Sequence, residues 1–193
     1  MAIRSFKTSS ISTGAKRSKF WDQSAVIITL AYESIQTVTV GSGGAASVSF
    51  TSIPSTFKHL QIRGISKNTT SSTDCNITIN SGTAAAYRHQ LLGDGSSATA
   101  QANSGNAYLI MTVGSTTANT FDASVIDFLD YSSTTKNKVV RALSGRDLNG
   151  SGLLSFGSAL WTTTTAISEI SIAPFSGNLA QYSQFALYGI KGA

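Results

Sequence analysis

Short apolar or alternating stretches, separated by clusters of Gly, Ser, Asn and Thr, follow one another from residue 24 to the end of the chain. In the stretch FKHLQIRGIS, for example, Leu60 and Ile62 alternate with polar residues. Alternation with a period of two predicts a strand that buries one face, whereas a helix would repeat its apolar residues every three or four positions. No long amphipathic helical pattern occurs, so we expect the chain to fold as β-structure.

The predicted strands are short and follow one another at spacings of roughly 8–15 residues. They cover residues 24–32, 35–40, 48–53, 57–66, 75–80, 85–92, 107–113, 121–131, 138–144, 153–161, 167–173 and 185–191. Polar loops are expected at residues 41–46, 68–74, 93–106, 114–119 and 146–152. This pattern predicts an all-β fold, an antiparallel β-sandwich or jelly roll of about 8–10 strands.

The composition changes the expected character of the sandwich surface. Only 12% of the 193 residues are charged, about half the usual share, whereas 31 are Ser and 23 are Thr. We expect these hydroxyl residues at the outward strand positions, where they would form a neutral surface that bonds to sugars or packs in an assembly. The single Cys excludes an internal disulfide, and the lack of an apolar run of about 18 residues argues against a membrane partner.

The net charge of +5 lies entirely in the first part of the chain. Residues 1–21 contain five basic residues and no acid, and the remaining chain has nine basic and nine acidic residues. This first part also lacks a sustained period, so we expect an extended basic arm at residues 1–23 and a β-sandwich domain at 24–193.

Three roles are open for this arm: a free solvated tail, a nucleic-acid-binding arm, or an anchor that docks on a partner protein. We expect the third, because aromatic residues stand among the bases, and nucleic acid is not the expected partner. The docking residues would be Arg4, Phe6, Lys7, Lys16, Arg17, Lys19, Phe20 and Trp21.

From the motifs of the sequence we expect no catalytic residue, metal site or cofactor. Nucleophile-elbow and phosphate-binding glycine motifs are absent. His59, His89 and Cys75 lack the spacing of a zinc site, and a buried thiol is the favoured interpretation of Cys75. The loop DLNGSG at 147–152 matches the first half of a calcium loop, but its twelfth position is Ser158, so a hairpin turn is favoured.

Aromatic residues at strand ends could provide a stacking platform for a glycan. Trp161 is the preferred candidate, with Tyr108 and Tyr87 as further members, and Tyr131 and Tyr182 are also placed near loops.

Two segments carry a resemblance to a known family. IPSTFKHLQIRG at 53–64 and SQFALYGIKGA at 183–193 together resemble small virion structural proteins of tailed bacteriophages, frequent in phages of cyanobacteria and other aquatic bacteria. The opening MAIRSFKTSSISTGAKRSKFW is similar to the basic arms that precede such domains. The resemblance implies a single β-sandwich in a virion assembled in the host cytoplasm, with no catalytic residues.

The expected function is therefore that of a non-enzymatic virion structural protein. In the first hypothesis it is a tail fibre or appendage subunit, a homo-oligomer expected to be a trimer, whose arm docks on another virion protein and whose loops 93–106 and 114–119 face a host glycan. A capsid decoration protein that stabilises the head is the alternative. A carbohydrate-binding module for a host receptor is the second alternative.

Overall fold

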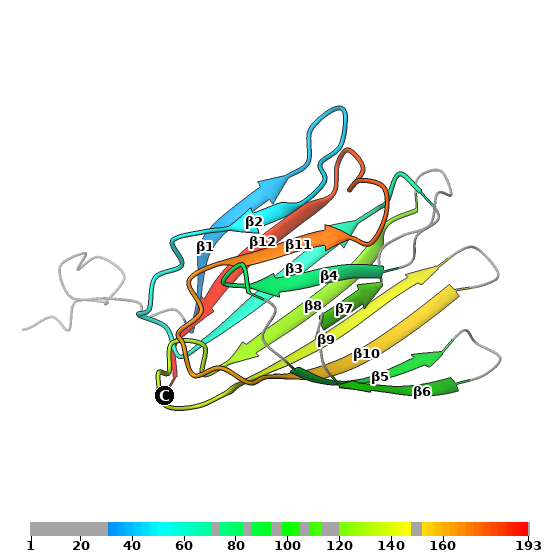
Figure 1. Ribbon diagram of the computed structural model, residues 1–193. Helices are drawn as coiled ribbons and strands as arrows, with labels where there is room; N and C mark the ends of the chain where they lie inside the picture. The colour runs from blue at the N-terminus through cyan, green and yellow to red at the C-terminus, as the bar shows by residue number, and fades with distance from the viewer. Residues whose placement is uncertain are drawn as a thin grey trace, which may run out of the picture. The chain divides into compact units, whose positions relative to one another are not determined.

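The computed structural model describes residues 31–70, 74–82, 86–93, 98–104, 109–112, 120–147 and 152–192. Residues 1–30 lie outside this description, and so do the expected arm and almost all of the first predicted strand. The described residues form twelve strands (Figure 1). They contain no helix, and hence no helix that could cross a membrane.

The strands form two antiparallel sheets. A wide sheet has the order β1-β12-β3-β8-β9-β10-β5-β6, and a narrow sheet has the order β2-β11-β4-β7. The strand bounds are β1 Tyr32–Thr39, β2 Val48–Phe50, β3 His59–Ser66, β4 Asp74–Ile79, β5 Ala86–Gly93, β6 Ala98–Ser104, β7 Leu109–Thr112, β8 Asp122–Leu129, β9 Lys138–Asp147, β10 Gly152–Trp161, β11 Ile170–Pro174 and β12 Gln184–Ile190.

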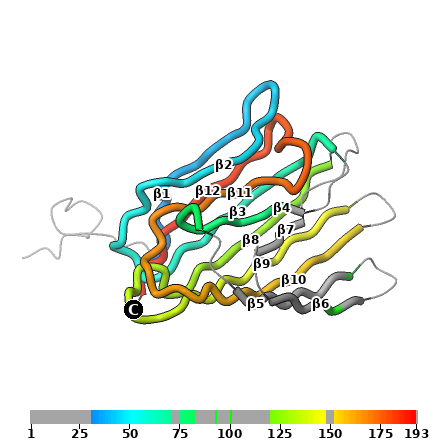
Figure 2. Tube along the Cα trace, in the orientation of Figure 1, coloured from blue at the N-terminus to red at the C-terminus, as the bar shows by residue number. Residues whose placement is uncertain are grey.

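Eight of these strands have the connectivity of a jelly roll. The pairing is nested: β1 pairs with β12, β2 with β11, β3 with β8, and β4 with β7. The paired halves then lie beside each other as β12–β3 in the wide sheet and β11–β4 in the narrow sheet (Figure 2). The predicted antiparallel sandwich with jelly-roll connections is thereby confirmed.

Two insertions account for the remaining four strands. β5 and β6 pair with each other between β4 and β7 of the chain, and β9 and β10 pair between β8 and β11. Both hairpins join the wide sheet and extend it beyond β8. β7, at the edge of the narrow sheet, lies against β9 and β10.

The core lies between the two sheets, and the alternation in the sequence predicts much of it correctly. Leu60 and Ile62 of β3 are buried, as are Phe185 and Leu187 of β12. The buried apolar residues are Val40, Val48, Phe50, Ile53, Phe57, Leu60, Ile62, Cys75, Ile77, Ile79, Ile126, Phe128, Tyr131, Val140, Ala142, Ala159, Trp161, Ile167, Ile170, Ile172, Leu179, Phe185 and Leu187. These side chains stabilise the sandwich by leaving water together.

β1 departs from the simple alternation. Ile35 and Val38 both pack against the core, although an odd separation should place them on opposite faces. A β-bulge between Ser34 and Gln36 adds an unpaired residue and reverses the sides after it.

One predicted loop is wrong. Residues 93–106 were expected to be a loop, but Ala98–Ser104 forms β6 and pairs with β5 along its length. The segment ATAQANS has few β-branched residues, so its strand character comes from the backbone hydrogen bonds that β5 offers rather than from propensity. The predicted loop at 114–119 lies outside the described residues.

Candidate interaction surface

The outer face of the wide sheet carries large apolar side chains where solvent-facing residues are usually polar. We call Ile65, Val125, Leu143, Leu154 and Phe156 the outer apolar patch. All five are exposed, with Leu154 at 57% and Phe156 at 46%. Val125, Leu143 and Phe156 lie directly side by side, because the β-ladders pair Val125 with Leu143 and Leu143 with Phe156.

The inner face behind this patch shows the opposite character. The row beside Val125, Leu143 and Phe156 consists of Ser124, Ser144 and Ser155, which are paired in the same register and buried. The expectation of outward Ser and Thr is therefore wrong in this part of the sheet. Small inward residues let the narrow sheet approach closely, since β7 lies against β9 and β10 here.

A shallow hollow of about 310 Å³ lies within the outer face. It is lined by Val125, Asp127, Arg141, Ala142, Leu143 and Phe156. Apolar side chains form one part of its wall, and a carboxylate and a guanidinium form the other. Such a mixture of an aromatic residue, an arginine and aliphatic residues is typical of protein–protein interfaces.

A polar network crosses the same face beside the patch. The side-chain Nε2 of Gln61 donates to Asp127 Oδ1 at 2.8 Å. Arg63 Nε in turn donates to the side-chain Oε1 of Gln61 at 2.8 Å. The Arg63 guanidinium also lies 5.8 Å from the centre of the Tyr32 ring and 5.6 Å from that of Tyr188. Arg63 of β3 therefore makes cation–π contacts with one tyrosine of β1 and one of β12, which fix the position of its guanidinium.

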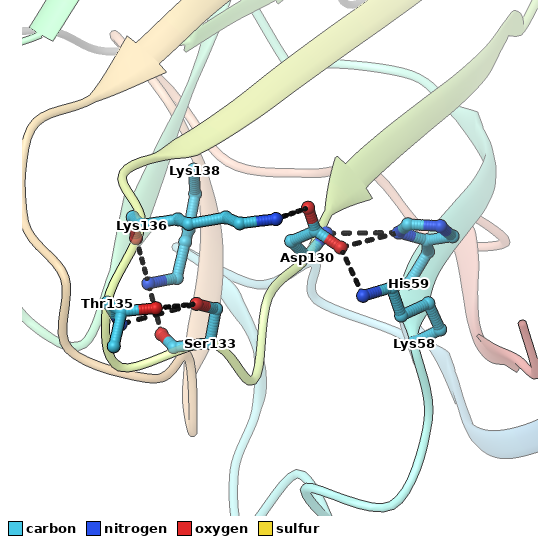
Figure 3. A network of polar contacts seen from close by, with 7 residues as sticks. All are labelled: Lys58, His59, Asp130, Ser133, Thr135, Lys136 and Lys138. Carbon is cyan, nitrogen blue, oxygen red and sulfur yellow. Dashed lines mark hydrogen bonds and ion pairs between the residues drawn. The ribbon is translucent and has the colours of Figure 1, made fainter.

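A second polar cluster closes the turn after β8 (Figure 3). Lys58 Nζ lies 3.0 Å and Lys136 Nζ 3.5 Å from the Asp130 carboxylate, while the Asp130 backbone N–H donates to His59 Nδ1 at 3.0 Å. The hydrogen bond from Lys58 and the charges of both lysines hold the pKa of Asp130 below its usual value. An imidazole nitrogen that accepts a backbone hydrogen bond and a carboxylate neutralised by two lysines stabilise a turn rather than provide acid–base chemistry.

Lys138 fastens the same turn from the interior. Its side chain is fully buried, and its Nζ donates to the carbonyl oxygens of Ser133, Lys136 and Thr164 at 2.5, 2.7 and 2.9 Å. Burial lowers the pKa of Lys138. The three carbonyl oxygens use all three donors of the ammonium group, so this lysine links two loops and has no donor left for a ligand.

A buried acid lies at the other end of the inner face. Asp122 is paired in register with Ser66, and among the described residues neither of its carboxylate oxygens nor Ser66 Oγ has a hydrogen-bond partner. Burial raises the pKa of Asp122 to about 6, against an opposing effect of Arg146. Because Asp122 is buried in the sandwich, it is not part of an accessible site.

The structure tests the predicted glycan platform only at Trp161. Trp161 is only 5% exposed, so the prediction of an exposed platform there is wrong; the ring lies on the inner face at the end of β10. Tyr108 and the Tyr87 side chain lie outside the description. Of the other two tyrosines, Tyr131 is buried and Tyr182 is exposed in a loop.

The structure describes only some of the other residues that were predicted to be functional. The eight docking residues of the arm fall outside the described part of the chain. Cys75 is buried and has no disulfide, as expected. Asp147 pairs with Gly152 across β9 and β10, as a hairpin requires, while residues 148–151 are not described. Within the ranges described, no group of metal-ligating side chains comes together.

The outer apolar patch was not predicted from the sequence, although the sequence contains a signal for it. β9 reads KVVRALSGRD and β10 reads GLLSFGSALW, and both carry large apolar residues at outward as well as inward positions. Near-continuous apolar runs are typical of strands covered on both faces.

The chain matches no model of a known protein family, and no curated protein matches it significantly. The resemblance to phage virion proteins therefore stays a prediction from the sequence.

Proposed function

We propose that this protein is a non-enzymatic structural subunit of a tailed-phage virion, of the tail fibre or appendage type, which docks through its basic arm. The observation that carries the proposal is the outer apolar patch: a jelly roll that exposes Leu154 and Phe156 on a flat sheet face is suited to contact with another protein. Jelly rolls serve capsids, lectins and enzymes alike, so the topology supports this role without selecting it.

The motifs that suggested a virion protein fit this interpretation. The segment 53–64 includes most of β3 and the segment 183–193 includes β12, and these strands are neighbours in the wide sheet. They build the scaffold that presents the outer face, and the basic residues of the arm would supply a second, electrostatic contact. Capsid decoration remains the alternative role, and the copy number per particle distinguishes it from a fibre.

The proposal can be tested by adding the purified protein to phage particles that were assembled without it and measuring whether it binds to them. Full-length chain and a variant lacking residues 2–21 are mixed with such particles, which are then purified on a gradient and analysed by quantitative mass spectrometry. We expect the full chain to sediment with the particles and the shortened chain to remain behind with an unchanged circular dichroism spectrum. A second variant, in which only the five bases of the arm become Gln, separates charge from the aromatic anchors.

Two results would contradict the proposal. Equal incorporation of the shortened chain would show that the arm does not dock. Failure of the full-length chain to join any particle would exclude the virion role itself.

A further inference from the structure

The outer apolar patch and the inward serine row together indicate that the wide sheet has a covered outer face. At one end of β3, β8, β9 and β10, large apolar residues point away from the core, whereas Ser124, Ser144 and Ser155 point into it. Folding alone would place the larger apolar side chains inside, because their burial removes more apolar surface from water. We propose that a second copy of this chain covers this face, in a dimer whose twofold axis runs parallel to β8 and β9, in place of the trimer expected from the sequence.

Charge selects the second copy as the occupant. Asp127 of β8 and Arg141 of β9 are direct neighbours in register and point outward, yet no ion pair joins them among the described residues. The pair of Asp127 and Arg141 matches its own image. At this pair, a uniformly charged partner such as a nucleic acid would meet one unfavourable charge for each favourable one.

The direction of the axis follows from the same pair. Rotation about an axis between β8 and β9 and parallel to them exchanges the positions of the two strands, so each Arg141 faces the partner subunit's Asp127. Rotation about an axis perpendicular to the strands would instead oppose like charges. An interface of this kind is isologous, because both copies use the same surface.

The same twofold rotation brings apolar residues of the two copies together. The strand order β3-β8-β9-β10 places β3 and β10 at equal distances from the axis. Leu154 of β10 then lies over the partner subunit's Ile65, because both belong to the row that contains Ala123 and Gly145. One row further, Val125 meets the partner's Leu143 beside the hollow.

The available area is sufficient for a stable dimer. Eight strands spaced about 4.8 Å apart, each about eight residues long at about 3.3 Å per residue, make a face of about 1,000 Å². A standard interface needs about 800 Å² from each partner. The pairing of two such sheets with aligned strands is also a common packing mode for β-sheets.

The test measures the mass of the full-length chain by light scattering and sedimentation equilibrium over a range of concentrations. We expect a species of twice the 20.1 kDa chain mass. Asp127→Arg and Arg141→Asp should each weaken the dimer by at least about tenfold, and the double exchange should restore it to within about threefold. Tyr182→Asn, which alters an exposed residue outside the strands, serves as the control and should leave the mass unchanged.

Thermal unfolding of each variant shows whether the loss of the dimer comes from unfolding of the chain. If a single exchange does unfold the chain, recovery of the dimer in the double exchange still tests the contact between Asp127 and Arg141. A monomeric full-length chain, a species of three copies, or single exchanges without effect would overturn the proposal. So would a full-length monomer that dimerises only after residues 2–21 are removed, since the arm would then be the occupant of the face.

Discussion

The ring of Phe57 lies directly against Gly189, in the space that a Cβ at this position would need. The reverse contact occurs nearby, where a Cβ at Gly64 would lie 2.6 Å from the ring of Phe185. Phe57 and Gly64 belong to the segment 53–64, and Phe185 and Gly189 to the segment 183–193. The two segments that carry the phage resemblance are thus complementary in shape, because a phenylalanine of each packs against a glycine of the other.

Substitution of either glycine by alanine should therefore destabilise the fold. Gly64→Ala and Gly189→Ala each force a buried aromatic ring to move, which typically costs about 1–3 kcal/mol. Gly41→Ala is the control, because no atom lies within 4 Å of the Cβ it would add. Urea denaturation of the three variants measures the difference, and equal stability of all three would contradict the shape argument.

Tyr131, in the turn after β8, provides a second prediction because it binds the loop before β3. Its buried hydroxyl donates to the carbonyl oxygen of Pro54 and accepts the backbone N–H of Phe57 at 3.3 Å. Tyr131→Phe leaves both backbone groups without this partner, so we expect a loss of about 1–2 kcal/mol in the free energy of unfolding. Tyr182→Phe removes a hydroxyl from an exposed ring and should have no measurable effect.

The buried Lys138 gives a third prediction. Lys138→Met keeps most of the apolar stem but leaves three carbonyl oxygens without their ammonium partner, which should cost about 3 kcal/mol. Lys136→Met, in the same turn, removes only an exposed contact to Asp130 and should cost less than about 1 kcal/mol. A smaller loss of melting temperature for Lys138→Met than for Lys136→Met would contradict the role of the buried ammonium.

The raised pKa of Asp122 should make the free energy of unfolding depend on pH. Its pKa is raised by burial from 3.8 to about 6, so between these pH values the folded chain retains a proton that the unfolded chain has lost. The contribution of Asp122 to stability is therefore complete below about pH 4 and is lost as the pH rises through about 6.

Asp122→Asn removes this dependence. We expect the variant to gain roughly 2–3 kcal/mol relative to the wild type between pH 4 and pH 7.5, because a shift of one pKa unit corresponds to about 1.4 kcal/mol. Urea denaturation of both proteins at the two pH values measures the change. Parallel stabilities across this range would show that burial does not perturb the carboxyl as described.

The sequence predicted the strands most accurately where one face is clearly apolar. Ile77 and Ile79, and likewise Phe185 and Leu187, are buried as their alternation indicated. It failed for β6, whose Ala, Thr, Gln and Asn residues have no strong preference, and for Trp161, since an aromatic residue at a strand end is found inside as well as outside. The candidate surface was missed for a related reason: no local rule assigns a side to strands that are apolar on both faces.

By itself, the sequence determined the class of fold, the approximate strands, the concentration of net charge before residue 22 and the side chains that share a face, because all of these depend on neighbours along the chain. The tertiary structure decided the nested pairing of the jelly roll and the insertion of two hairpins into one sheet. It also decided that Phe156 points out and Ser155 points in. Which face of β10 becomes the interior depends on the narrow sheet that packs against it, because β7 lies against β10 and is held in that sheet by its pairing with β4.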